Sequence, residues 1–432
     1  MPVTNIRMIC PRALCTMASD AKPGSVVVIS DGRIVDVGAK SDMVQKYPSS
    51  EIIELPDCLV MPSLVNAHSH ISLSDTFGKV SGKTFIEWLA NLIELRKDRT
   101  SDDIEKASQD GLRQLVRMGI TTIGDSNPDL IPLEVAINKK FRGVFYFEVF
   151  GITAPIQSVK IKEYREQLQA GLKLQNSYSR LGISPHTPYT VTASVMRFAS
   201  GFASKHNLPV SVHVAESMFE LEFMKSKNSD ARKIMAPYSR RIPVVEGSLM
   251  SYLDSYKILS EKTICAHGVY LSDDDFKLLA KRKGTLVSCP SSNRNVGSDF
   301  LDISRPFNAG VNVCIGTDSP ASSDGYDLFH ELRIALMVDG EKRLAITALD
   351  ALRMITVNPA RILGFGDEVG TIEKGKSADL IAIKPPQKFD FDADDIPEEI
   401  LRNVSGEDVV MTMSSGKVRF SSLKTIPEEN PI

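Results

Sequence analysis

Two histidines separated by one residue, His68 and His70, end an apolar run that begins at residue 58. Side chains of an extended strand alternate between its two faces, so both imidazoles would lie on the same side. Neutral imidazole is the commonest protein ligand for zinc and similar ions. An isolated pair of this kind is more often an accident of a loop. The metal interpretation therefore depends on further ligands elsewhere in the chain.

Further ligand candidates close other short apolar runs. His213 follows PVSV, and Asp318 follows VNVCIGT. Three imidazoles and one carboxylate, with a position left for water, are typical of a catalytic metal site. A bound metal lowers the pKa of water from about 16 to about 7. The sequence predicts one divalent ion on these four residues, with zinc favoured over iron or manganese. The alternative for Asp318 is a cap on the helix that follows.

Three more residues could complete such a site. Glu216 lies three residues beyond His213, where it could pass a proton from the activated water to a leaving nitrogen; the alternative is an ordinary acidic residue at a helix start. His267 follows TICA and is expected to be a further ligand, a second base or a polariser of the substrate. His186, between two prolines, is expected to contact substrate or only to shape its loop.

The composition is that of an ordinary globular enzyme. The 432 residues are 42% hydrophobic and 24% charged, with a formal net charge of -3. The charge argues against nucleic-acid binding, and no apolar stretch reaches the roughly 18 residues that span a membrane. The six cysteines are scattered without a C-x-x-C motif, which indicates reduced core residues. We expect a cytoplasmic protein without a membrane partner.

Eight apolar runs alternate with helical patterns in the middle of the chain. This alternation predicts a parallel (β/α)8 barrel over residues 58–365. The segments 1–57 and 366–432 instead show short alternating runs around glycine turns, such as Asp31-Gly32. We expect these two segments to pair into one small β-sandwich domain. The barrel strands would be CLVMPSLVNAH, TTIGD, GVFYFEVFG, LGISPH, PVSVHVAE, TICAHG, GTLVSCP and VNVCIGTD.

The candidate site residues share a place in these runs, because each stands where a predicted strand ends. Active sites of such barrels lie at the carboxyl ends of the strands. Residues as far apart as His68 and Asp318 could therefore meet around one ion.

The motifs NAHSH, HVAE, AHGVYLS, GTDSPASS and GTIEKGKSADLIAI together resemble the amidohydrolase superfamily over almost the whole chain. The resemblance implies a distorted (β/α)8 barrel with a β-sandwich from both termini. The fourth strand lacks the lysine of binuclear members, which resembles the mononuclear deaminase and chlorohydrolase branch. That branch implies His68, His70, His213 and Asp318 as ligands. It also implies Glu216 as proton shuttle, with His267 and Asp318 steadying the attacking water.

Within this branch the chain looks most like deaminases of adenosine derivatives: S-adenosylhomocysteine, methylthioadenosine, 5'-deoxyadenosine or aminodeoxyfutalosine. The likeness implies substrate contacts from Trp88, from Glu94 to a ribose, from His186 and from Ser322. Members that recognise homocysteine carry arginines after the third strand. This chain has none there, which speaks against S-adenosylhomocysteine.

The predicted function is hydrolytic deamination at C6 of an adenosine derivative, a small nucleoside-type substrate. The alternatives are deamination of guanine or cytosine, dehalogenation of a triazine, and a non-catalytic relative. The likeness implies a homodimer or homotetramer. The long segment 225–260 either covers the substrate or lies at a subunit contact.

Overall fold

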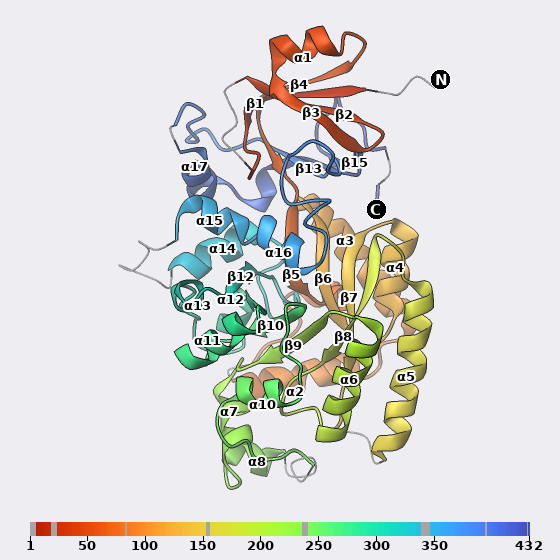
Figure 1. Cartoon of the computed structure of the whole chain (residues 1–432), viewed down its shortest axis with the longest axis vertical. Helices are drawn as coiled ribbons and strands as arrows, with labels where there is room; N and C mark the ends of the chain where they lie inside the picture. Colours follow the sequence, from red (N-terminus) through yellow and green to blue (C-terminus); the bar gives the residue numbers. More distant parts are fainter. Residues whose placement is uncertain are drawn as a thin grey trace.

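The computed structural model describes residues 6–18, 24–82, 84–152, 156–235, 241–337, 346–393, 395–429 and 431–432. Two sheets organise these residues, as Figure 1 shows. An eight-stranded sheet comes from the middle of the chain. A seven-stranded sheet comes from both of its ends and lies beyond one end of the barrel.

The eight-stranded sheet forms the predicted barrel. Its neighbouring strands pair in parallel. A parallel bridge between Ser69 and Asp318 joins the first strand to the segment after the last, so the sheet is nearly closed. This confirms the predicted (β/α)8 architecture. In chain order the strands are β5 (Leu64–Ser69), β6 (Ile120–Asn127), β7 (Arg142–Val149), β8 (Ser179–Pro185), β9 (Val210–Val214), β10 (Thr263–His267), β11 (Thr285–Ser288) and β12 (Asn312–Ile315).

Helices connect the strands and cover the outside of the barrel (Figure 1). Ser272 caps α11 in a reciprocal pair with Asp275: each side chain accepts a hydrogen bond from the backbone N–H of the other residue. The helices around the barrel are α2 (Phe85–Arg96), α3 (Ser101–Arg117), α4 (Ile131–Lys139), α5 (Gln157–Leu174), α6 (Ala193–His206), α7 (Met218–Lys225), α8 (Asp230–Ile234), α10 (Leu249–Ser255), α11 (Asp273–Lys281), α12 (Pro290–Asn295), α13 (Ser304–Asn308), α14 (Leu328–Met337), α15 (Ala348–Arg353) and α16 (Val357–Ile362), with the 3-10 helix η1 (Ile71–Thr76).

The second sheet joins the two ends of the chain, as predicted. Its strand order is β15-β14-β13-β4-β1-β2-β3. Asp31 and Gly32 both have positive φ, 51° and 78°, which is the turn that favours a tight hairpin between β2 and β3. The strands are β1 (Arg7–Leu14), β2 (Ser25–Ser30), β3 (Arg33–Ala39), β4 (Glu51–Pro62), β13 (Leu380–Ile383), β14 (Val409–Ser414) and β15 (Lys417–Ser421), with helices α1 (Lys40–Lys46), α17 (Ile396–Asn403) and η3 (Gly406–Asp408). The division of the chain at residues 57 and 365 stays a prediction.

Three other expectations concern the rest of the chain. All six cysteines are buried free thiols. In the part of the chain that the structure describes, no helix has the length and apolar character needed to cross a membrane. The long segment 225–260 contains α8 and α10, and its residues 236–240 lie outside the described residues.

Candidate metal centre and active site

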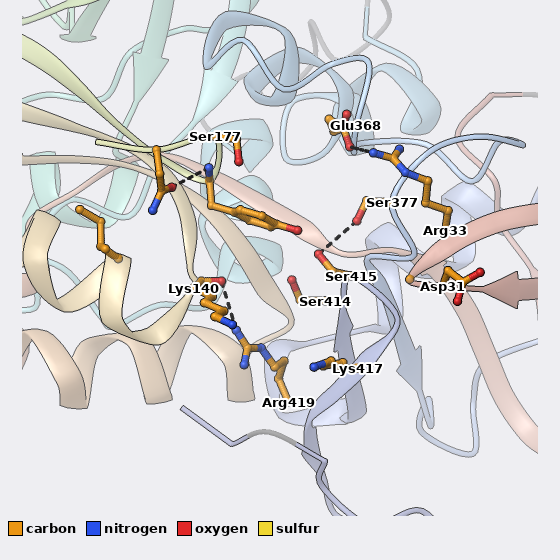
Figure 2. A pocket seen from close by; sticks show the side chains of 14 residues that line it. Asp31, Arg33, Lys140, Ser177, Glu368, Ser377, Ser414, Ser415, Lys417 and Arg419 are labelled. Carbon is orange, nitrogen blue, oxygen red and sulfur yellow. Dashed lines mark hydrogen bonds and ion pairs between the residues drawn. The ribbon is translucent and has the colours of Figure 1, made fainter. Parts of the chain in front are cut away.

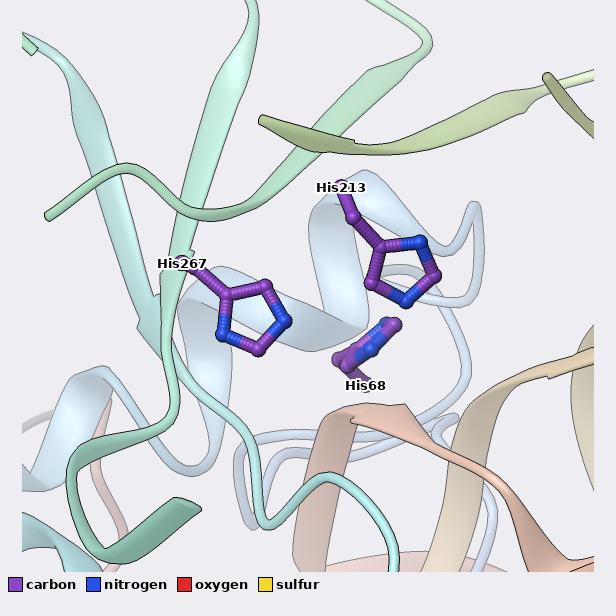
Figure 3. A group of neighbouring side chains, drawn as sticks. All are labelled: His68, His213 and His267. Carbon is purple, nitrogen blue, oxygen red and sulfur yellow. The ribbon is translucent and has the colours of Figure 1, made fainter. Parts of the chain in front are cut away.

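The predicted ligands meet at the carboxyl ends of the barrel strands. His68 stands on β5, His213 on β9 and Asp318 just beyond β12. The ring centroids of His68 and His213 are 4.8 Å apart, and those of His68 and His70 are 5.0 Å apart. Figure 3 shows the rings of His68, His213 and His267 turned toward one another. The barrel therefore brings together residues up to 250 positions apart, as the strand ends predict.

Backbone carbonyls fix how two of these rings point. Nδ1 of His70 lies 2.6 Å from the carbonyl oxygen of Ser126, and Nδ1 of His213 lies 2.9 Å from that of His186. A carbonyl can only accept, so each Nδ1 carries a proton, and in the neutral form of the ring each Nε2 keeps a lone pair. The two Nε2 atoms lie 3.3 Å apart. Nε2 of His68 is buried without a hydrogen-bond partner among the described residues. A cation at their meeting point would satisfy all three.

Asp318 supplies the negative charge of the cluster. Its Oδ1 lies 3.2 Å from Nε2 of His70 and 3.7 Å from Nε2 of His68. Its Oδ2 accepts hydrogen bonds from the hydroxyls of Ser292, at 2.5 Å, and Ser322, at 3.0 Å. One oxygen is thus held by hydroxyls while the other faces the imidazoles.

The electrostatics favour a cation at this point. Burial lowers the pKa of His68, and lowers that of His213 to about 3, so both rings stay neutral. Burial alone would raise the pKa of Asp318, but the hydrogen bond and charge of His70 outweigh it and hold the pKa well below the usual range. The same contact raises the pKa of His70 to about 9 against the effect of burial, so Nε2 of His70 would have to release a proton on binding a metal ion. Ligand atoms of His68, His70 and Asp318 lie within 4.8 Å of one another, a donor set that suits zinc and related ions.

Three residues of the site have left-handed backbone. Ala215, His267 and Asp318 have φ values of 52°, 70° and 59°. Non-glycine residues rarely adopt this region, and each such position costs on the order of 1–3 kcal/mol. At His267 and Asp318 the unusual backbone occurs at residues whose side chains face the cluster. The surrounding barrel must therefore hold this geometry against a local cost.

Glu216 and His267 form the acid-base side of the site. Oε1 of Glu216 lies 3.8 Å from Nε2 of His267. Burial raises the pKa of the Glu216 carboxyl, which allows it to hold a proton more readily. The backbone N–H of Glu216 donates to Oε2 of Glu220 at 3.0 Å. Nδ1 of His267 lies 2.8 Å from Oδ1 of Asn293, which leaves Nε2 as the nitrogen that faces Glu216.

The predicted substrate residues are not all brought to the cluster. His186 is next to it, with its ring centroid 5.0 Å from that of His213 and 4.5 Å from that of Phe150. Ser322 touches Asp318 directly. The structure therefore places both beside the metal-ligand candidates.

The two candidates on α2 differ from each other. Trp88 is buried, and its indole N–H donates to the carbonyl oxygen of Ala321 at 3.0 Å, close to the segment that carries Asp318. The Glu94 side chain is 76% exposed and lies 3.7 Å from Lys97. The structure does not bring Glu94 to the cluster.

Sequence reasoning missed Glu148, a carboxylate inside the barrel. Glu148 is 2% exposed, and its Oε1 has no hydrogen-bond partner among the described residues. A carboxylate oxygen of Glu148 lies within 4.8 Å of ligand atoms of His70 and His213. Burial raises the pKa of the Glu148 carboxyl. A glutamate within the buried run GVFYFEV of β7 is the signal that could have found it, because such a residue needs a partner.

Sequence reasoning also missed Asp125, a second carboxylate inside the barrel. This buried residue lies near the end of β6 and accepts hydrogen bonds from the hydroxyl of Ser69, at 3.1 Å, and the backbone N–H of Ile71, at 2.8 Å. It therefore holds the residues on both sides of His70. Burial raises the pKa of the Asp125 carboxyl to about 7.

The chain is similar in sequence to two deaminases along most of its length. The chain is 31% identical over 365 residues to the 5-methylthioadenosine/S-adenosylhomocysteine deaminase of Pyrococcus furiosus, covering 83% of this chain and 82% of the relative. It is 25% identical to the 5'-deoxyadenosine deaminase of Methanosphaera stadtmanae, covering 96% and 95%.

A solved structure supports the fold. The zinc-bound adenosine deaminase of Xanthomonas campestris superposes with a TM-score of 0.83 at 22% identity, covering 97% of this chain and 94% of that one. The model of the amidohydrolase family matches residues 59–419, which span the barrel and the part of the terminal sheet that follows it in the chain. The chain therefore belongs to the amidohydrolase family, as its motifs indicate.

Proposed function

We propose that the chain is a metal-dependent hydrolytic deaminase of an adenosine derivative. The observation that carries this proposal is the convergence of three imidazoles and the Asp318 carboxylate opposite the buried Glu216–His267 pair. Ligands alone would suit many hydrolases. A buried carboxylate facing an oriented imidazole adds a group that can move a proton beside an activated water. The names of the two similar relatives support the substrate class.

His68, His70, His213 and Asp318 would hold one divalent ion, for which we propose zinc. The donor set of nitrogens and one oxygen fits zinc but also accepts iron or manganese, and the Xanthomonas relative is described with bound zinc. When bound, such an ion supplies a water whose pKa lies near 7 instead of about 16.

The residues of the chain would then act on this water and on the ring. Glu216 accepts a proton from the water and delivers it to the ring nitrogen next to C6. The water oxygen bonds to C6, and the proton left on that oxygen then passes to the exocyclic amine. The bond from C6 to the exocyclic nitrogen breaks, ammonia leaves, and the ring keeps a C6 carbonyl with the first proton on the neighbouring nitrogen. His267, fixed by Asn293, and Asp318, fixed by hydroxyls, orient the attacking oxygen. General acid-base transfer of this kind contributes on the order of 10²–10⁴-fold in rate.

Substrate contacts from His186, Ser322 and Trp88 are part of the proposal. His186 stands beside His213, and Trp88 packs behind the loop of Asp318. The exposed position of Glu94 gives no support to a ribose contact. Homo-oligomerisation as a dimer or tetramer and a cytoplasmic location are also proposals, which light scattering and cell fractionation would test.

The test is ammonia release by protein of known metal content. Methylthioadenosine, 5'-deoxyadenosine, S-adenosylhomocysteine and aminodeoxyfutalosine are compared with guanine, cytosine and a chlorotriazine. Preferential turnover of one 5'-modified adenosine supports the proposal and names the substrate. Turnover confined to guanine or cytosine would replace the nucleoside assignment with the alternative. Metal binding without turnover of any compound would contradict the deaminase assignment for this panel.

A further inference from the structure

One charged side chain inside the barrel, Glu148, has no role in the proton transfer proposed above. It stands on β7, where Val144 and Tyr146 pack in one cluster with residues of β5, β10, β11 and β12. These strands lie on different sides of the barrel, so the cluster fills its interior. Side chains of a strand alternate between two faces, and Glu148, two residues beyond Tyr146, therefore points into the barrel as well. It stands one residue before the end of β7, near the rim where the metal-ligand candidates meet.

The buried carboxylate of Glu148 has no partner within the described part of the chain. Its Oε1 accepts no hydrogen bond there, and neither of its oxygens forms an ion pair. Other buried carboxylates differ in this respect. Asp125 accepts a hydrogen bond from the backbone N–H of Ile71, and Glu331 accepts one from Ser291. Because burial of a carboxylate without a partner is costly, the position of Glu148 favours a cation beside it.

Charged groups at the opposite end of the barrel show the same contrast. A cavity lies there between the barrel and the terminal sheet (Figure 2). In its wall Arg33 pairs with Glu368 at 3.3 Å. Arg419 donates to the carbonyl oxygen of Lys140 at 3.2 Å. Both guanidinium groups are thus held by protein partners, unlike the carboxylate of Glu148.

Arg96, at the end of α2, is a positive charge that acts on Glu148 from a distance. Burial raises the pKa of the Glu148 carboxyl, and the charges of His70 and Arg96 oppose this rise. Among the residues that the structure describes, however, Arg96 forms no ion pair with Glu148. Arg96 therefore leaves both oxygens of the carboxylate available to another group.

The carboxylate of Glu148 lies close to two of the metal-ligand candidates. Ligand atoms of Glu148, His70 and His213 all lie within 4.8 Å of one another. Two ligands of one zinc ion are at most about 4.4 Å apart, which is twice a bond of about 2.2 Å. A small rotation of the flexible Glu148 side chain therefore brings one of its oxygens within reach of an ion bound by the two imidazoles.

The two imidazoles have no N–H to donate to Glu148 once they bind an ion. Nδ1 of His70 faces the carbonyl oxygen of Ser126, and Nδ1 of His213 faces that of His186. The two Nε2 atoms, 3.3 Å apart, are the nitrogens left to bind the ion. Hydrogen bonds from these rings therefore cannot compensate the carboxylate, whereas the positive charge of the ion can.

We propose that Glu148 is a further ligand of the ion at the proposed metal centre. The site then offers three imidazole nitrogens and two carboxylate oxygens. Carboxylate ligands suit manganese and other hard ions, whereas imidazole suits zinc and iron. Glu148 therefore shifts the preference of the site toward manganese, compared with the preference of the other four ligands alone. The inference rests on the metal centre of the proposed function and does not depend on the identity of the substrate.

The first test is a crystal structure of the full-length protein loaded with zinc. We expect an oxygen of Glu148 about 2.0–2.2 Å from the ion, the usual length of a bond between zinc and a carboxylate oxygen. A distance of more than about 3 Å would overturn the proposal, because no bond to the ion exists at that separation.

The second test measures the dissociation constants of Zn²⁺ and Mn²⁺ by competition with a chelator. Glu148→Gln keeps the size of the side chain and removes its charge, so it should weaken Mn²⁺ binding more than Zn²⁺ binding. We expect the ratio of the two constants to change about fivefold or more. The control Glu134→Gln removes an exposed carboxylate of α4 and should change the ratio by less than about twofold. Thermal unfolding checks that each variant folds.

The outcomes separate this inference from the metal centre on which it rests. An unchanged ratio in a folded Glu148→Gln variant that binds both metals would overturn the inference and leave the metal centre in place. Binding of neither metal by the unmodified protein would overturn both. If Glu148→Gln does not fold, the distance in the zinc-loaded crystal decides alone.

Discussion

Replacement of Glu216 by glutamine tests the proposed proton transfer most directly. The two side chains have nearly the same shape, and the backbone N–H of Glu216 keeps its acceptor, Oε2 of Glu220, 3.0 Å away. The four metal-ligand candidates keep their own side chains, of which Asp318 has a carboxylate oxygen within 4.8 Å of one of Glu216. The variant should therefore fold and bind metal as before. Only the capacity to carry a proton is lost.

The size of the effect follows from that single loss. General acid-base catalysis contributes about 10²–10⁴-fold, which is about 2.7–5.4 kcal/mol at 1.36 kcal/mol per tenfold change in rate. Burial raises the pKa of the Glu216 carboxyl, so the carboxyl can both accept and release a proton nearer neutral pH than an exposed glutamate. We therefore expect Glu216→Gln to lower kcat on the best adenosine derivative by at least a hundredfold.

The assay is ammonia release, with the metal content of each sample measured in parallel. Glu222→Gln is the matched control, because Glu222 lies on the same helix, α7, and is exposed. It should keep kcat within twofold. A Glu216→Gln enzyme with full metal content and a kcat within threefold of the unmodified enzyme would refute the shuttle role. Loss of metal in this variant would instead show that Glu216 helps to hold the ion.

Other residues of the site and the core give four further expectations. Asn293→Ala removes the acceptor that orients Nδ1 of His267 and should lower kcat/KM about tenfold or more, since an unpaired buried donor costs about 1–3 kcal/mol. Asn293→Asp should restore part of the loss. Equal activity of the unmodified enzyme and both variants would contradict the orienting role. Glu148→Gln removes a carboxylate beside His70 and His213 and should weaken metal binding about tenfold or more, as the loss of a group next to the metal ligands commonly does. Competition with a chelator measures the metal affinity, and an unchanged affinity would count against a role of Glu148 in metal binding. Glu94→Gln should leave KM within twofold, because the side chain is 76% exposed; a large rise in KM would restore the predicted ribose contact. Burial raises the pKa of Glu331 from 4.5 to about 8, so the unfolded chain releases this proton at lower pH than the folded chain does. The free energy of unfolding therefore falls as pH rises from about 4.5 to 8 and is constant above. Denaturant unfolding should show Glu331→Gln to be more stable than the unmodified protein at pH 8, by at most about 4–5 kcal/mol, with a smaller difference at pH 5.

The barrel and its ligand candidates could be predicted because both depend on short patterns. Each barrel strand is a buried apolar run, and the residue that ends it faces the same rim. His68, His213 and Asp318 therefore meet although no local signal links them. The hairpin at Asp31-Gly32 is equally local, because two positive φ values need residues of this kind.

Glu94 shows where local likeness is not enough. Successive residues of a helix are about 100° apart around its axis, so Glu94 points roughly 120° away from Trp88, six residues before it. Trp88 and Leu92 form the buried face of α2. A glutamate at this spacing therefore faces solvent, and a residue four or seven positions after Trp88 would be needed to share its side. The resemblance supplied a residue type, whereas the helical period decides its direction.

The residues that orient the site could not be predicted, because their partners come from distant parts of the chain. Three consecutive residues of α12, all completely buried, each hold a different group. Ser291 donates from its backbone N–H to Oε2 of Glu331 at 2.9 Å, Ser292 donates to Oδ2 of Asp318 at 2.5 Å, and Asn293 accepts from Nδ1 of His267 at 2.8 Å.

This arrangement explains how one short helix can serve both sides of the site. Neighbouring residues on a helix point about 100° apart, so Ser292 and Asn293 reach a metal-ligand candidate and the acid-base histidine from a single backbone. The Glu331 bond to Ser291 fixes that backbone against α14. His267 and Asp318 both have left-handed φ, and such conformations persist only where the surroundings hold them. The hydrogen bonds from α12 supply that restraint, so the run of small polar residues after β11 is a consequence of the geometry the two side chains need.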